Sequence, residues 1–171
     1  MSARLSLAIS LGDAARAILR KTRSFPEQGF GTFTDIRQSD HIGVEPMLLA
    51  LSMELALKAW FVFDYDDPKV AKLHDLEKLY KKLLPASQEA LEKEFKRSIA
   101  PYYPNWLYPE YGIENILYQH KDAFVDWRYL HERKSTRFEI GAFEATLEMV
   151  LQEFEKRYKI EPVMRLDTNA T

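Results

Sequence analysis

Cysteine is absent from the 171 residues, and histidine and glycine are scarce, with four and six copies. Without cysteine the chain has no disulfide framework, no thiolate zinc site and no cysteine nucleophile. The four histidines form no His-Glu-x-x-His motif, and neither Glu110 nor Glu114 stands three residues from His120, the spacing of di-iron bundles. We therefore expect neither a metal nor another cofactor.

An excess of charge of one sign is also lacking, because 24 Lys and Arg residues stand against 26 Asp and Glu residues, a formal net charge of -2. This balance gives no global attraction to nucleic acid or to a membrane. The charge is nevertheless segregated, since residues 1–23 carry five basic residues and one acidic, and residues 138–171 carry seven acidic and four basic. These opposite charges would allow a dimer that pairs basic with acidic surfaces.

The longest hydrophobic run, residues 46–63, contains Glu54 and Lys58. Two central charges would be costly in lipid, so a buried central helix explains this run better than a membrane span does. The N-terminal stretch is too polar for the apolar core of a signal peptide. We expect a cytoplasmic protein with no membrane partner.

Helical spacing of apolar residues dominates the chain, and most prolines and glycines fall between the periodic segments. This pattern predicts an all-α fold, an antiparallel, up-and-down bundle of five to six helices. Pro85 is expected to end one helix, and Ser87 to cap the next. The expected single domain, 1–171, comprises an N-terminal helix and long loop (1–43), a bundle core (44–159) and a frayed tail (160–171). The expected helices span 4–22 with a restart at Asp13, 46–63, 74–84, 88–99, 113–132 and 138–159.

Residues 100–112 form an aromatic loop that contains Tyr103 and Trp106 among its five aromatic residues. Exposed aromatic rings can stack on nucleic-acid bases, typically beside basic residues. Here the basic residues lie outside the loop, at positions such as Lys96 and Lys121. The alternative is a packed loop that closes one end of the bundle.

Glu54 and Lys58 are four residues apart, so they lie on the same side of the expected central helix and can pair. One interpretation is that they form the single solvated stripe of this helix. The alternative is that they form the floor of a polar groove or part of a dimer interface.

Arg128, His131 and Glu132 cluster on the expected fifth helix, where Arg128 and His131 are three residues apart. A histidine near neutral pKa beside a guanidinium can act as general base or acid next to an oxyanion stabiliser, as RNA transesterification requires. The alternative is a salt-bridge network at the end of a helix.

Three stretches together resemble the HEPN superfamily of prokaryotic helical bundles, over roughly residues 44–159. They are Leu51-Ser-Met-Glu-Leu-Ala-Leu-Lys-Ala59, His74-Asp-Leu-Glu-Lys-Leu79 and Phe124-Val-Asp-Trp-Arg-Tyr129. The resemblance implies a four- or five-helix up-and-down bundle that dimerises and serves in toxin-antitoxin, phage-defence or stress systems. It also implies, for catalytic members, a metal-independent ribonuclease whose arginine precedes a histidine by four to six intervening residues.

The chain departs from that catalytic spacing, since only two residues separate Arg128 from His131. We therefore expect a HEPN-like interaction protein that forms a homodimer and has RNA or a protein as its partner. The alternative is a metal-independent endoribonuclease that uses Arg128 and His131 at a dimer interface. The expected binding residues are Glu54, Lys58, His74, Tyr103, Trp106 and Glu132.

Overall fold

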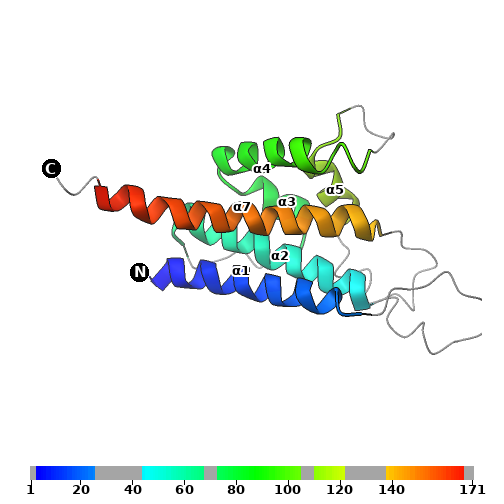
Figure 1. The fold of residues 1–171 in the computed structure, drawn as a ribbon, viewed down its shortest axis with the longest axis horizontal. Coiled ribbons are helices and arrows are strands. Elements are labelled where there is room, and N and C mark those ends of the chain that lie inside the picture. Colours follow the sequence, from blue (N-terminus) through cyan, green and yellow to red (C-terminus); the bar gives the residue numbers. More distant parts are fainter. Residues whose placement is uncertain (1–2, 26–43, 68–72, 105–109, 122–137, 168–171) are drawn as a thin grey trace, which may run out of the picture.

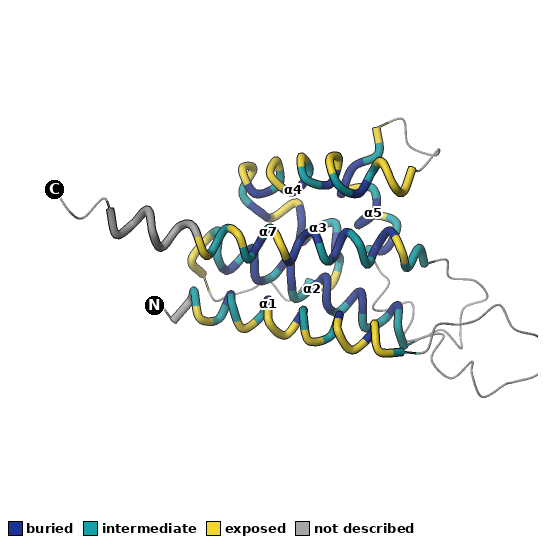
Figure 2. Tube along the Cα trace, in the orientation of Figure 1, coloured by how far each residue is buried: buried dark blue, intermediate teal, exposed yellow. Residues whose placement is uncertain are grey.

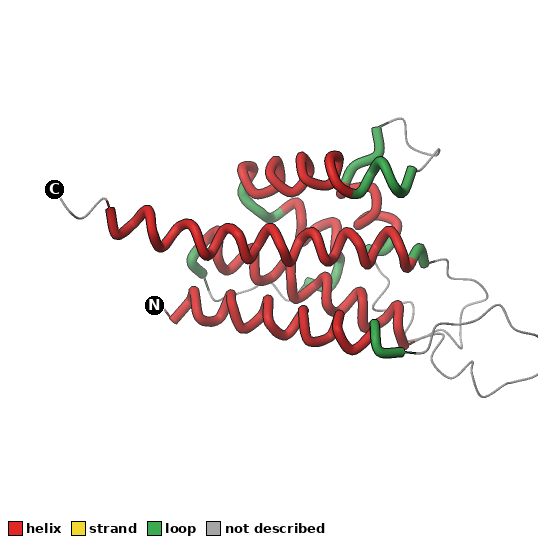
Figure 3. The backbone as a smooth tube through the Cα atoms, in the orientation of Figure 1, coloured by secondary structure: helices red, strands yellow, loops and turns green. Residues whose placement is uncertain are grey.

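The computed structural model describes residues 3–25, 44–67, 73–104, 110–121 and 138–167, with the backbone alone at 3–4 and 160–167. Within these ranges all regular structure is helical (Figure 3), which confirms the predicted all-α class. The helices are α1 (Ala3–Thr22), α2 (Val44–Tyr65), α3 (Leu76–Lys81), α4 (Pro85–Ser98), α5 (Ile113–Gln119) and α7 (Ile140–Asp167).

The four long helices, α1, α2, α4 and α7, alternate in direction along the chain (Figure 1). α1 packs on α2, α2 also contacts α7, and α7 contacts α4, while the short helices α3 and α5 contact each other and fill the side between α2 and α4. Exposed positions run along α1 and α4, which are the outer helices (Figure 2). The arrangement is the expected up-and-down bundle.

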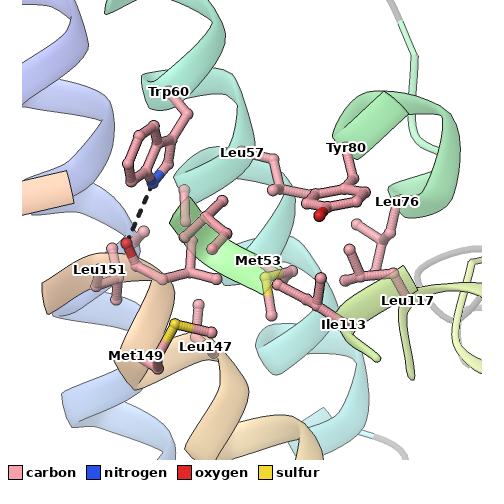
Figure 4. Packing of buried hydrophobic residues seen from close by; sticks show 14 of the residues in the cluster. Met53, Leu57, Trp60, Leu76, Tyr80, Ile113, Leu117, Leu147, Met149 and Leu151 are labelled. Carbon is pink, nitrogen blue, oxygen red and sulfur yellow. Dashed lines mark hydrogen bonds between the residues drawn. The ribbon is translucent and has the colours of Figure 1, made fainter. Parts of the chain in front are cut away.

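α2 is the central helix, as its apolar composition predicts. By length and composition it could cross a membrane, but most of its apolar stretch is buried inside the bundle. Figure 4 shows Met53 and Leu57 between the side chains of α3 and α5 and those of α7. The apolar stripes of α3, α4 and α7 are also buried, namely Leu76, Leu79, Tyr80 and Leu83, then Leu91, Phe95 and Ile99, then Phe143, Leu147, Val150, Leu151 and Phe154. The stripe of α1 is buried at Ala15 and Leu19 and half-buried at Leu5, Ile9 and Ile18, and Tyr158 of α7 is also half-buried.

Small residues bring α1 close to the rest of the bundle. Ala15 is fully buried, and its carbonyl accepts a 2.7 Å hydrogen bond from the Ser52 hydroxyl of α2. A Cβ at Gly12 would lie 3.0 Å from a ring carbon of Phe154, so a larger residue would force α1 away from α7. The expected helix restart at Asp13 is wrong, because α1 runs without a break through this position.

The start of α4 differs from the expectation. Pro85 is the first residue of the helix, where its missing N–H costs nothing, and Leu84 is the N-cap residue. Ser87 therefore lies inside the first turn and does not cap the helix. The backbone N–H of Leu84 instead donates to Asp64 at the end of α2 (2.9 Å), which supplies the capping acceptor from another helix.

Three other boundaries also shift. α3 is shorter than expected and begins after Asp75, whose carboxylate accepts from the Lys78 N–H at 3.0 Å as an N-cap. The helix expected over 113–132 ends at Gln119, and residues 122–137 lie outside the described part of the chain. α7 continues through Pro162 to Asp167, beyond the expected end of this helix at residue 159.

Candidate functional site

Glu54, Lys58 and His74 form one cluster on the side of the central helix. The Lys58 ammonium donates to Glu54 Oε1 at 2.6 Å, and His74 Nδ1 lies 3.0 Å from Glu54 Oε2. Each oxygen of the carboxylate therefore has its own basic partner. The structure thus brings together three of the residues that the sequence identifies as binding residues.

The cluster is not the solvated stripe that one interpretation of the sequence predicted. The side chain of Glu54 is 4% exposed and that of Lys58 is 15% exposed, whereas that of His74 is 58% exposed. A carboxylate this deeply buried needs hydrogen-bonding and charged partners, because desolvation otherwise penalises it strongly. The burial favours the alternative, in which the pair belongs to a groove or an interface.

The ion pair lies within an apolar stripe that we call the α2 face, whose members are half-buried except for the exposed Tyr65. Its members recur every three or four residues, so they share one side of the helix. The Phe61 and Tyr65 rings pack on each other at a centroid distance of 4.8 Å, and Tyr65 is 46% exposed. The α2 face consists of Leu48, Leu51, Leu55, Lys58, Phe61 and Tyr65.

Replacing Lys58 with methionine is expected to lower the free energy of unfolding by about 2 kcal/mol, because Glu54 would keep a buried charge and lose its nearest cation. The double variant Glu54→Leu/Lys58→Met removes both charges and should recover most of that loss. Urea denaturation followed by circular dichroism measures both values. A double variant less stable than Lys58→Met would contradict the assignment of the loss to an unpaired Glu54.

A second polar network, around Asp64, was not predicted from the sequence. Asp64 Oδ1 accepts from Ser87 Oγ and from Arg157 Nη1, each at 2.7 Å, and its side chain is 0% exposed. Arg157 also contacts Ser87, and its guanidinium lies 5.2 Å from the ring centroids of both Trp60 and Phe63. The network joins the end of α2, the start of α4 and α7, so its role is to hold these helices together.

His120 is a buried structural residue, 4% exposed, at the end of α5. Its Nδ1 donates to the Ile116 carbonyl at 2.8 Å, and its Nε2 accepts from the Glu139 N–H at 3.1 Å. The ring packs against Phe138 and Phe143 at centroid distances of 4.5 and 5.0 Å. Burial lowers the pKa of His120, against smaller opposing effects of the Ile116 carbonyl and the Glu139 charge. The neutral ring therefore joins α5 to the start of α7.

The described part of the aromatic loop is exposed at Tyr102 and Tyr103 and packed at its end, where Tyr111 contacts Phe95 at a centroid distance of 5.5 Å and Gly112 is buried. Tyr102 is 77% exposed and Tyr103 is 39% exposed, and the Tyr103 ring lies beside Gly141 in the first turn of α7. Trp106 lies outside the described residues.

Three predicted site residues, Arg128, His131 and Glu132, lie outside the described residues, so the convergence of Arg128 with His131 stays a prediction. In the ranges that the structure covers, no three His, Asp or Glu side chains gather in a way that could hold a metal ion.

The charged ends of the chain meet within one molecule. Arg16 pairs with Glu155 at 2.7 Å, and Arg23 pairs with Glu144 at 2.5 Å and with Glu148 at 2.7 Å. The Arg23 guanidinium holds the pKa of Glu148 below its ordinary value. Much of the basic and acidic surface that the sequence offered to a dimer is therefore neutralised between α1 and α7.

Fold and site together define an all-α helical bundle with a buried ion-pair cluster on its central helix. Compared with known proteins, the chain matches no family model, no curated protein and no solved structure.

Proposed function

We propose that the protein is a HEPN-like interaction module that forms a homodimer through the α2 face and associates with RNA, in the cytoplasm of a prokaryote, as part of a stress, toxin-antitoxin or phage-defence system. The observation that carries this proposal is the α2 face itself. It places the half-buried Leu51 and Leu55 on one side of the Glu54–Lys58 pair and the half-buried Phe61 on the other.

A surface of this composition suits a second copy of the same chain. Half-exposed apolar residues gain free energy when a partner removes them from water, by about 25 cal/mol for each Å². A two-fold dimer presents the same face from both subunits, so one apolar helix face is enough to build the interface. The RNA association is supported by the exposed basic residues Arg20 and Lys21 near the end of α1.

The variant Leu51→Glu is expected to convert a dimeric wild type into a monomer, because it would bury two carboxylates across a two-fold interface. Light scattering after size-exclusion chromatography measures the mass. Tyr102→Glu, at an exposed position of the aromatic loop, is the matched control and should stay dimeric. A monomeric wild type, or dissociation by Tyr102→Glu alone, would contradict the role of the α2 face.

The protein is expected to leave total RNA intact in EDTA. Cleavage by the wild type that the Arg128→Ala/His131→Ala variant loses, with both proteins equally folded by circular dichroism, would replace the interaction module with a metal-independent endoribonuclease.

A further inference from the structure

The facing surfaces of α1 and α7 form a ladder of side chains with three steps. Arg16, Arg20 and Arg23 recur at i, i+4 and i+7, so they lie on one face of α1. Glu148, Gln152 and Glu155 have the same spacing on α7, which runs in the opposite direction to α1 (Figure 1). The two end steps are closed ion pairs, Arg16 with Glu155 and Arg23 with Glu148.

The middle step lacks its carboxylate. Arg20 is exposed and forms no ion pair with any residue in the described ranges. The residue at the corresponding position of α7 is the neutral Gln152, whose side chain is hydrogen-bonded to Glu148. The Arg20 guanidinium can therefore still bind an oxyanion through two parallel hydrogen bonds.

A cavity of about 170 Å³ lies at this step, lined by Arg16, Arg20, Arg23 and Gln152 together with Glu148 and the apolar residues next to them. It has room for several water molecules, since one water needs at least about 10–15 Å³ by the same measure. The negative charges beside it are already paired, Glu144 and Glu148 with Arg23 and Glu155 with Arg16. An anion entering the cavity therefore meets the guanidinium of Arg20, which has no carboxylate partner among the described residues.

We propose that Arg20 and Gln152 form a binding site for a phosphate group, which takes the place of the missing carboxylate. The guanidinium of Arg20 supplies two parallel N–H donors to the phosphate oxygens, and the neutral amide of Gln152 avoids the repulsion that a carboxylate would add. Arg16 and Arg23 flank the site and stay bound to their own glutamates. The site rests on the proposed function, to which it adds the place where an RNA phosphate would bind.

Two variants test the site from opposite sides. Arg20→Gln removes the guanidinium donor. Gln152→Glu supplies a carboxylate that can pair with Arg20 and so takes the place of the phosphate. Each is expected to weaken binding of a fluorescein-labelled single-stranded oligouridylate roughly tenfold in an anisotropy titration. Each should also reduce the salt slope of log K by about 0.7, the value of one phosphate contact on a single strand. Arg97→Gln is the matched control, since Arg97 is 71% exposed on α4 and pairs with Glu94, and its affinity should equal that of the wild type.

A second measurement separates the two sources of the phosphate. Inorganic phosphate, titrated against chloride at constant ionic strength, should shift the Nε–H resonance of Arg20 in the wild type and not in Gln152→Glu. Circular dichroism confirms that each variant is folded.

The outcomes distinguish this site from the proposed function. If the wild type binds the oligouridylate and both variants bind it equally well, the phosphate site is overturned and RNA association stands. If the wild type does not bind the oligouridylate but phosphate shifts Arg20, the site stands for free phosphate or a nucleotide, and RNA association fails. If neither probe binds, both fail.

Discussion

Replacing Asp64 with alanine is expected to lower the free energy of unfolding by about 3 kcal/mol. The carboxylate is fully buried and accepts three hydrogen bonds, from Leu84 N, Ser87 Oγ and Arg157 Nη1. Its loss would leave the N–H of Leu84, the N-cap residue of α4, without its acceptor and Arg157 without its carboxylate. Removal of one partner of a buried ion pair costs up to about 3–5 kcal/mol. We place the effect at the low end because the Arg157 side chain is 26% exposed.

Urea denaturation followed by circular dichroism measures this loss. Glu94→Ala is the control, since it removes an ion pair with the 71% exposed Arg97 and should change the free energy of unfolding by less than about 0.5 kcal/mol. In the double variant Asp64→Ala/Arg157→Met the two effects should be less than additive, because the residues are in contact. A loss below about 1 kcal/mol in Asp64→Ala would show that the network does not hold the helices together.

Lowering the pH below 6.5 is expected to destabilise the protein through His120. Burial lowers the pKa of His120 in the folded state from its ordinary value of 6.5. Below pH 6.5 the unfolded chain therefore binds a proton that the folded chain excludes, and stability falls as the pH falls towards the folded pKa. One such group accounts for at most about 1.4 kcal/mol for each pH unit. Burial of the ring is the main cause, and a proton on Nε2 would also displace the hydrogen bond that this nitrogen accepts from the Glu139 N–H.

The variant His120→Gln isolates this effect, because glutamine keeps one donor and one acceptor and does not titrate between pH 5 and pH 6.5. The difference in unfolding free energy between wild type and variant should shrink across that window as the pH falls. Carboxylates with a lowered pKa, such as Glu94, Glu148 and Glu155, contribute stability that is lost only below about their ordinary value of 4.5. Their contributions are the same in the wild type and in His120→Gln, so they cancel in the difference between the two unfolding free energies. A difference in unfolding free energy that does not vary with pH would contradict a buried, neutral His120 that excludes a proton.

The sequence predicts those parts of the fold that depend on local periodicity. The apolar stripes of α3, α4 and α7 repeat every three or four residues, and burial follows them directly. The pairing of Glu54 with Lys58 was predictable for the same reason, since both residues stand one turn apart on one helix. Boundaries were less predictable, because the start of α4 depends on an acceptor, Asp64, from another helix.

Contacts between distant residues could not be derived from periodicity. Asp64 and Arg157 are 93 residues apart, so no local spacing predicts their contact. The one indication in the sequence is the position of Arg157. Arg157 stands three residues after Phe154, which places a charge beside the apolar stripe of α7, and such a charge requires a buried partner. The sequence does not say which of the many carboxylates that partner is. For His120, the terminal position on α5 gave no indication that its ring would bond to the backbone of Glu139.

Two consecutive carbonyls of α7 accept hydrogen bonds from other helices, and this has a mechanical consequence. Trp60 Nε1 of α2 donates to the Val150 carbonyl at 3.1 Å (Figure 4), and Arg16 Nη2 of α1 donates to the Leu151 carbonyl at 2.8 Å. A displacement of α7 along its axis by one residue, about 1.5 Å, would break both bonds. Axial sliding of α7 would therefore require both bonds to break together, so they fix the register of α7 against α1 and α2.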